Sequence, residues 1–251
     1  MGRAPPPRAM RLPPGTSLAE LREEQRRLAA AVSRRNGFRT VRTVAGVDIA
    51  YAGDRGFAAI VVLRATDLAV TETAVAARAV DFPYIPGYLA YREFPLIEAA
   101  YARLREPPSV LLVDGHGQIH PARCGVACMV GIRLGVPTIG VAKSPLVGRT
   151  ERTPRMGEAV PVRERGEVPG FAFRPGPSIR LLYISTGHRV APRTAVRIVR
   201  DLCRTRDPEP LRLADSLARE HKENKGKMSK GGSLLAPIPG GERPKARRSR
   251  A

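Results

Sequence analysis

The order of short apolar segments most constrains the fold of this chain. Three strand-like segments, at 43–51, 57–64 and 70–80, follow one another with only tight turns between them. Strands joined by such turns pair as antiparallel neighbours. Two further apolar segments, at 109–114 and 137–143, are separated by a helical segment, and helical crossovers make successive strands parallel. The sequence therefore predicts an α/β fold: a mixed β-sheet, with an antiparallel meander plus parallel strands, flanked by helices.

Helical periodicity and capping signals predict the elements around this sheet. Ser17 with Glu20 three residues later is typical of a capping box at a helix start. The stretch 145–178 is rich in Pro and Gly, so we expect a loop there with at most a short strand at 171–174. A further strand is expected at 179–186. The expected helices are 16–35, 86–106, 124–135, 191–204 and 210–220.

Positive charge is concentrated at the two ends of the chain. The net charge of +20 indicates a polyanionic partner. Residues 1–15 contain three Arg, five Pro and no acid, and residues 221–251 contain nine Lys or Arg against two Glu. Such composition is typical of disorder. We therefore expect a Pro/Arg-rich disordered start (1–15), a single folded domain (16–220) and a basic disordered tail (221–251).

Several absences narrow the class of protein. The chain contains no run of about 18 apolar residues, so no membrane span is predicted. The start of the chain lacks the apolar core of a secretory signal. The cysteines, Cys124, Cys128 and Cys203, form neither a disulfide framework nor a CxxC zinc motif. We therefore expect a cytoplasmic protein without membrane association. Nothing indicates an obligate protein partner, so we expect a monomer.

Two acids interrupt apolar strands. Asp48 lies inside VAGVDIAY, and Asp114 ends VLLVD. A buried carboxylate is costly unless it is paired, hydrogen-bonded or bound to a metal, and open α/β sheets bind ligands at the carboxyl ends of their strands. With Glu93 and Asp215 on predicted helices, these acids would form an oxygen-rich pocket suited to Mg²⁺ or Mn²⁺. A basic protein with such a pocket predicts phosphodiester chemistry. Each acid also has an alternative interpretation. Asp48 could pair with an arginine, Asp114 could cap a turn, and Glu93 and Asp215 could lie on solvated helix faces.

The segment FPYIPG at 82–87 predicts a stiff aromatic turn. Pro83 and Pro86 restrict the backbone on either side of Tyr84 and Ile85. A rigidly held tyrosine is suited to stack between nucleic-acid bases. A turn that only packs against the core is the alternative.

Two further loops and one lysine supply candidate phosphate contacts. Gly115 in DGHGQIHP lets the backbone approach a ligand closely. His120 in the same loop and His188 in STGHRV could donate to a phosphate, with a satisfied loop histidine as the alternative. Lys143 is the one lysine among 30 arginines within 16–220, a weak indication that this position needs a compact point charge.

Together these motifs resemble those of the endonuclease V family, deoxyinosine 3′ endonucleases of the ribonuclease H-like group. The resemblance implies a ribonuclease H-like fold and an Mg²⁺-dependent endonuclease of DNA repair. Such an enzyme cuts the second phosphodiester bond 3′ of deoxyinosine and other deaminated bases, leaving 3′-hydroxyl and 5′-phosphate ends. The matching stretches, in the family's order, are VAGVDIAY, FPYIPGYLAYREFPLI, VLLVDGHGQIHPARCGVA, VPTIGVAKSPLVG, YISTGHRV and PEPLRLAD.

The resemblance also implies residue roles. Asp48 and Asp114 match the aspartates that bind the metal ion, which would be Mg²⁺ with Mn²⁺ as a substitute. The tyrosine of PYIP matches a wedge that intrudes beside the damaged base. The matching catalytic residues are Glu93, Lys143 and Asp215.

Two alternatives stay open at this point. A related ribonuclease H-like nuclease acting on inosine-containing RNA or structured DNA would have the same carboxylates, and contacts to a 2′-hydroxyl cannot be recognised in the sequence. A noncatalytic basic nucleic-acid-binding protein would bind without Mg²⁺-dependent cleavage. The complete set of acids and lysine argues against this second alternative. The expected partner is DNA that contains deaminated bases, with inosine-containing RNA as the alternative.

Overall fold

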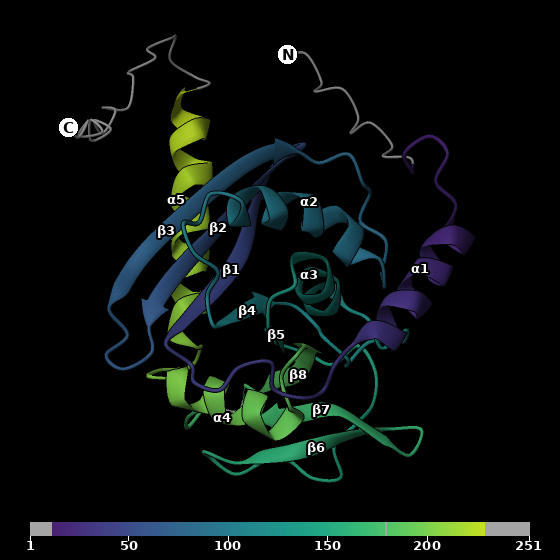
Figure 1. Cartoon of the computed structure of the whole chain (residues 1–251), viewed down its shortest axis with the longest axis vertical. Helices are drawn as coiled ribbons and strands as arrows, with labels where there is room; N and C mark the ends of the chain where they lie inside the picture. The colour runs from purple at the N-terminus through teal and green to yellow at the C-terminus, as the bar shows by residue number, and fades with distance from the viewer. Residues whose placement is uncertain (1–11, 179, 229–251) are drawn as a thin grey trace, which may run out of the picture.

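The computed structural model describes residues 12–178 and 180–228 (Figure 1). The strands form one eight-stranded mixed sheet in the order β3-β2-β1-β4-β5-β8-β7-β6. They are β1 (Thr43–Ala52), β2 (Arg55–Arg64), β3 (Val70–Ala79), β4 (Val110–Asp114), β5 (Thr138–Ala142), β6 (Ala159–Glu164), β7 (Glu167–Phe173) and β8 (Leu182–His188). The helices are α1 (Leu18–Ala31), α2 (Leu89–Tyr101), α3 (Val126–Leu134), α4 (Pro192–Leu202) and α5 (Glu209–Met228). Within the described ranges, no helix has the length and apolar character needed to cross a membrane.

The strand directions of the predicted part of the sheet are confirmed. β1, β2 and β3 form an antiparallel meander, and β4 pairs in parallel with both β1 and β5. The carboxyl ends of β1, β4 and β5 therefore meet at one edge of the sheet, which we call the carboxyl edge. β8 pairs antiparallel with β5, so it begins at this edge and ends at the opposite one.

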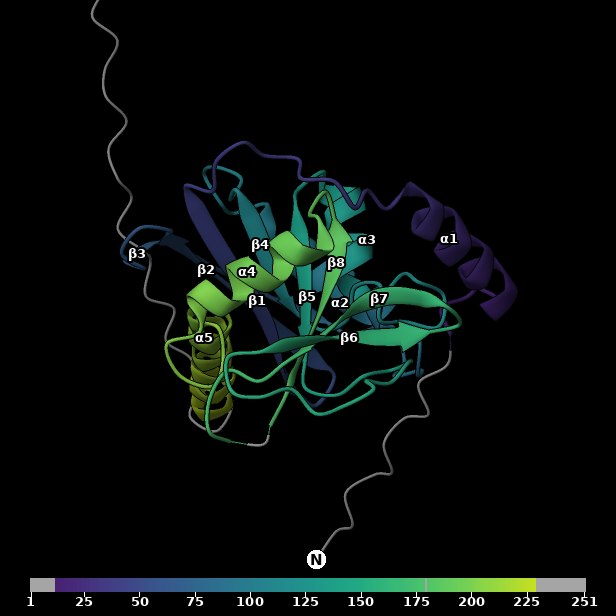
Figure 2. The same ribbon diagram turned by 90° about the horizontal axis from the view of Figure 1, so that it is seen from below.

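Helices cover both faces of the sheet (Figures 1 and 2). In β4, Leu111 belongs to the core under α2 and α3, whereas its neighbour Leu112 belongs to the core under α4 and α5. Successive strand residues point to opposite faces, and a strand covered on both sides has a continuous apolar sequence. This three-layer arrangement explains why the central strands could be recognised from short apolar runs.

The prediction that 145–178 is mainly a loop was wrong. This stretch contains β6 and β7, an antiparallel hairpin that extends the sheet beyond β8. Pro161 in β6 and Pro169 in β7 lower the strand signal because proline cannot donate to a ladder. The edge position of β6 tolerates Pro161, while Val160 and Val162 pack against Ile119 in a small separate cluster.

The ends of the domain differ partly from expectation. The predicted capping box is present, since Glu20 N–H donates to Ser17 Oγ and Ser17 N–H donates to the Glu20 carboxylate. The last helix, expected at 210–220, continues to Met228, so the first residues of the predicted disordered tail are helical. The helix-forming Lys and Glu residues after 220 explain the extension. Residues 1–11 and 229–251 lie outside the described residues.

Candidate active site

Asp48 and Asp114 lie side by side near the carboxyl edge. Val47 on β1 is in register with Val113 on β4, and each acid is the next residue on its strand. Both acids follow residues of the α2 and α3 core, so both point to the opposite face of the sheet. Their half-buried carboxylates therefore face the same side, at adjacent positions on parallel strands.

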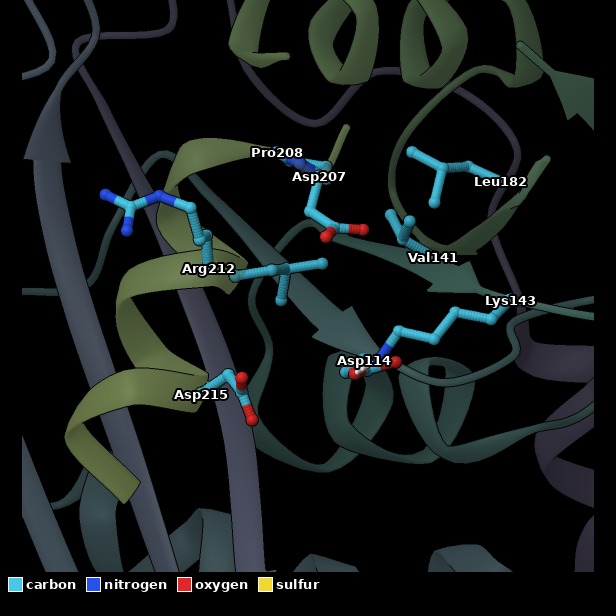
Figure 3. Close-up of a pocket in the computed structure, with 9 residues that line it drawn as sticks. Asp114, Val141, Lys143, Leu182, Asp207, Pro208, Arg212 and Asp215 are labelled. Carbon is cyan, nitrogen blue, oxygen red and sulfur yellow. Dashed lines mark hydrogen bonds and ion pairs between the residues drawn. The ribbon is translucent and has the colours of Figure 1, made fainter. Parts of the chain in front are cut away.

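Lys143 reaches Asp114 from the neighbouring strand. Asp114 is in register with Val141 on β5, and Lys143 follows two residues later. The Lys143 Nζ atom donates to Asp114 Oδ2 at 2.7 Å (Figure 3). The lysine side chain remains 71% exposed, whereas that of Asp114 is 23% exposed. The ammonium group is therefore held beside the acid pair while still open to a ligand.

Asp215 reaches the same pocket from α5. A Cβ on Gly46 of β1 would lie 2.3 Å from the Pro210 carbonyl, so glycine is required where the start of α5 crosses the strand. Asp215 then lies across the pocket from Asp114 and Lys143 (Figure 3). Its Oδ1 atom accepts from Arg219 Nε at 2.7 Å.

Glu93 approaches the acid pair from α2, on the other face of the sheet. Its Oε1 atom accepts from the Tyr51 hydroxyl at 3.5 Å, and the guanidinium of the adjacent Arg92 lies 4.8 Å from the centre of the Tyr51 ring. The acids therefore come from both layers and from the strands between them.

Burial of the acids, and then repulsion between them, determines the electrostatics of the site. Desolvation, and then the charge of Asp114, raise the pKa of Asp48 to about 7. Desolvation, followed by the charges of Asp48 and Asp114, raises the pKa of Glu93 to about 8. Desolvation opposes protonation of Lys143, but the hydrogen bond and charge of Asp114 outweigh it and raise the pKa of the lysine. The site therefore favours additional positive charge.

This set of donors fits a hard divalent cation such as Mg²⁺. In the described part of the chain, no group of three or more His, Cys, Asp and Glu side chains is arranged to enclose a metal ion. Mg²⁺ does not need such an enclosure, because it commonly binds one or two carboxylates together with waters and substrate phosphates. Asp48 and Asp114 occupy adjacent positions on parallel strands, and the charge of Asp114 raises the pKa of Asp48, so this pair of carboxylates matches the requirement.

The FPYIPG turn presents Tyr84 to solvent from a fixed base. The Tyr84 side chain is 68% exposed, whereas Phe82 is buried. The Gly87 carbonyl accepts two hydrogen bonds, from Gln25 Nε2 at 2.7 Å and from His120 Nε2 at 3.1 Å. The remaining predicted contacts in this turn are Pro83, which is buried, Ile85, which is half-buried, and Pro86, which is exposed.

His120 and Gly115 stabilise the loops of the site. The His120 Nδ1 atom accepts from Ala122 N–H at 3.1 Å, so the Nε2 atom carries the proton donated to Gly87. Burial, and then the charge of His116, lower the pKa of His120 to about 4. Both ring nitrogens are thus engaged with backbone, which leaves His120 no donor for a phosphate. A Cβ on Gly115 would lie 2.5 Å from Val126 Cγ1, so glycine is required for the loop to pack on α3.

His188 lies away from the candidate active site. It pairs with Thr138, at the start of β5, whereas Lys143 follows the end of β5. Its Nδ1 atom accepts from Ser33 N–H at 3.3 Å. The structure therefore does not bring His188 together with the acid pair, because β8 runs antiparallel to β5 and ends at the opposite edge of the sheet.

The structure adds residues that the sequence did not single out. Asp207 and Arg212 line the pocket together with Asp114, Lys143 and Asp215. Arg212 Nε donates to Glu209 at 2.9 Å. In the sequence, Asp207 before Pro208 looks like an ordinary helix start. That Asp207 lines the pocket becomes evident only from the position of α5 at the carboxyl edge.

Comparison with known proteins agrees with this architecture and these motifs. Residues 26–216 match the family model of Endonuclease V. Endonuclease V of Roseiflexus sp. is 47% identical over 205 residues, which cover 81% of this chain and 92% of that protein. The crystal structure of Endonuclease V from Streptomyces avermitilis has a TM-score of 0.79 and 36% identity, covering 86% of this chain and 99% of that chain. Ciona intestinalis Endonuclease V, in complex with a 24mer DNA containing an inosine followed by a ribo-adenosine, has a TM-score of 0.75 and 27% identity, covering 83% and 98%. The chain therefore belongs to the Endonuclease V family and is an endonuclease, a phosphodiester hydrolase with a ribonuclease H-like fold.

Proposed function

We propose that this protein is an Mg²⁺-dependent repair endonuclease that cuts the second phosphodiester bond 3′ to deoxyinosine and other deaminated bases, leaving 3′-hydroxyl and 5′-phosphate ends. The observation that carries this proposal is the register that sets Asp48 beside Asp114, with Lys143 bonded to the second acid. The inosine-containing DNA bound by the Ciona intestinalis relative supports the substrate class.

The chemistry follows from the charges around the acid pair. When bound by Asp48 and Asp114, Mg²⁺ supplies charge neutralisation at the phosphate and a water of lowered pKa. The exposed ammonium group of Lys143 would donate to a phosphate oxygen and stabilise the negative charge that develops there. Glu93, which lies close enough to Asp48 and Asp114 to feel their charges, would complete the metal site or orient the attacking water. Asp215 would orient a water on the α5 side of the pocket.

Recognition of the damaged base would use the Tyr84 turn. Removing a base from the stack costs a few kcal/mol, and an exposed tyrosine on a fixed turn can fill the space that the base leaves. Hypoxanthine O6 accepts a hydrogen bond where the adenine N6 group donates one. A backbone N–H directed at this position would discriminate by about 1–3 kcal/mol.

Inosine-containing RNA is a second candidate substrate. The nucleotide that follows inosine in the Ciona intestinalis complex is a ribo-adenosine, so that relative binds a strand with a ribonucleotide next to the inosine. The carboxylate chemistry would be the same on either sugar.

A cytoplasmic location and a monomeric state stay predictions from the sequence.

The decisive experiment compares inosine-containing DNA, RNA of the same sequence and undamaged DNA, each with and without Mg²⁺. We expect cleavage only with Mg²⁺ and only beside inosine, mapped on a sequencing gel to the second phosphodiester bond on the 3′ side. Preferred cleavage of RNA would make RNA the substrate. Binding without any cleavage would favour the noncatalytic alternative and defeat the proposal.

A further inference from the structure

A groove leads away from the candidate active site on the α5 side. Its walls include Lys143, Leu182 and Asp207, which also line the pocket that contains Asp114 and Asp215. The groove is therefore continuous with that pocket. Its other lining residues are Arg180, Leu181 and Arg206, and we call it the Arg180–Arg206 groove.

The Arg180–Arg206 groove is basic at its rim and apolar at its floor. Arg180 is exposed, and no ion pair within the described ranges involves its guanidinium group. The Arg206 side chain is 53% exposed and its Nε lies 3.3 Å from Asp207 Oδ2. With Lys143, which pairs with Asp114 of the adjoining pocket, the lining contains three cations, one acid and the buried Leu182. Arginines around an apolar strip match a chain that alternates phosphates with sugars.

The groove and the Tyr84 turn lie on opposite sides of the acid pair. The turn packs with α1 through Phe82 and Leu21, and it leads into α2. Leu182 of the groove belongs instead to the core shared with α4 and α5. Asp48 and Asp114 lie on the strands between these two layers.

We propose that the Arg180–Arg206 groove binds the phosphates of the cleaved strand on the 3′ side of the scissile bond. This inference rests on the proposed function, in which the cut is 3′ to the damaged base. A strand with its base at Tyr84 and its scissile phosphate at the acid pair crosses the carboxyl edge in the 5′ to 3′ direction. The nucleotides beyond the cut then enter the groove, where Arg180 and Arg206 each contact a phosphate.

The test uses inosine duplexes whose cleaved strand ends either a single nucleotide or about six nucleotides beyond the scissile bond, within the length that a strand-binding groove covers. Affinity is measured in EDTA over a range of salt concentrations. We expect the wild-type protein to bind the longer substrate more tightly. Arg180→Ala and Arg206→Ala should each remove most of this gain. The slope of log affinity against log salt concentration on the longer substrate should fall by about 0.7–0.9 for each phosphate that the variant no longer binds.

Two controls make the test specific to this groove. Arg105→Ala removes an arginine whose side chain is 87% exposed and that precedes β4, at the opposite edge of the sheet, so it should keep the gain. Arg180→Lys keeps the charge and should restore most of the affinity. Extending the substrate on the 5′ side should affect all variants equally.

The outcomes separate this inference from the proposed function. If the wild-type protein does not cleave inosine substrates, both fall. If it cleaves them but the 3′ extension brings no gain, the groove does not bind the strand beyond the cut. If the arginine variants keep the gain, or weaken binding of both lengths equally, the assignment of Arg180 and Arg206 to the 3′ side is overturned.

Discussion

At the scale of single residues, the acid pair depends on strand register. Val47 and Val113 are paired and buried, and a slip of one residue would turn every side chain of either strand to the other face. The apolar residues that flank Asp48 and Asp114 therefore fix the position of both carboxylates. Repulsion between these acids destabilises the folded state. The apolar cores on both faces of the two strands offset this destabilisation.

Asp114→Asn tests the metal assignment. The amide keeps the shape but removes a negative charge that Lys143 and a metal ion would share, so cleavage in Mg²⁺ should fall by orders of magnitude. Binding of inosine DNA should persist with Ca²⁺, because the basic surface is unchanged. Stability should change little, since the substitution relieves repulsion with Asp48. Cleavage rates and gel-shift affinities on the same oligonucleotide measure both effects.

A matched control for this variant is Asp67→Asn. Asp67 is half-exposed, pairs with Arg64 at 2.7 Å and follows β2 at the edge opposite to the site. This variant should cleave at the wild-type rate. Near wild-type cleavage by Asp114→Asn would contradict the assignment of this residue as a metal ligand.

The raised pKa values predict that the metal-free protein loses stability as pH rises from 6.5 to 8. In this window the folded state retains protons on Asp48, whose pKa is about 7, and on Glu93, whose pKa is about 8. The unfolded chain has already released them, since the ordinary values are 3.8 and 4.5. Unfolding therefore releases protons, and each contributes up to about 1.4 kcal/mol per pH unit. Histidines with lowered pKa values act in the opposite direction near pH 6.5, where the unfolded chain still holds part of their protons, so the decline should be clearest above about pH 7.

Urea unfolding in EDTA measures this pH dependence. Asp48→Asn should flatten the decline, because one of the two titrating acids is removed. Added Mg²⁺ should stabilise the protein more at pH 8 than at pH 6.5, because the metal competes with protons for the carboxylates. A flat or rising stability of the metal-free protein across this window would show that these acids do not carry raised pKa values.

Residues differ in how much the sequence reveals about them. Asp48 and Asp114 could be found because an acid inside an apolar strand is conspicuous whatever its neighbours are. The role of His188 depended on the direction of β8, which is set by pairing with β5 and β7 and has no local signal. Likewise, the burial of His120 follows from packing against the Tyr84 turn, which lies far away in the sequence.

At the scale of elements, α1 holds the turn that presents Tyr84. The Gln25 side chain is 3% exposed, and its hydrogen bond to Gly87 joins α1 to the turn. Gln25→Ala leaves the Gly87 carbonyl with His120 as its remaining side-chain donor, a loss of about 0.5–1.5 kcal/mol. We expect weaker discrimination between inosine and undamaged DNA, with cleavage at saturating enzyme largely retained.

Comparison with Tyr84→Ala makes this prediction quantitative. Loss of base stacking on the ring should cost selective binding about 1–3 kcal/mol, so the Gln25 variant should show a smaller loss in the same direction. Glu23→Ala, an exposed change on the same helix, should have no effect on discrimination. If Gln25→Ala weakens binding to damaged and undamaged DNA equally, α1 does not act through the turn.

Elements also show where sequence patterns reach their limit. The meander and the two parallel strands were predictable because each strand is a buried apolar run between recognisable turns. β6 and β7 contain prolines and exposed charged residues, and their pairing across Arg165–Gly166 becomes evident only in the folded sheet. The extension of α5 was missed because a Lys-rich segment has similar composition in a solvated helix and in a disordered tail.

At the scale of the whole molecule, the three layers order the path of a substrate. The Tyr84 turn belongs to the α2 side, the acid pair to the sheet, and the Arg180–Arg206 groove to the α5 side. A bound strand that touches all three must cross the carboxyl edge. The separation between base recognition and cleavage is then a property of the fold, because different layers supply the two sets of residues.

The charge beyond α5 gives the last prediction at this scale. Residues 229–251 contain six Lys or Arg and one Glu, but none of the residues of the candidate site. Truncation after Met228 preserves the whole of α5. Because each phosphate contact adds about 0.9 to the dependence of log affinity on log salt concentration, the truncated protein should bind duplex more weakly and with a shallower salt dependence. Cleavage at saturating enzyme should survive.

A variant in which residues 229–251 are replaced by an uncharged Gly/Ser segment of equal length controls for chain length, and should behave like the truncation. An unchanged salt dependence in both variants would mean that this segment does not contact the substrate, and that the arginines of the folded domain provide the electrostatic attraction.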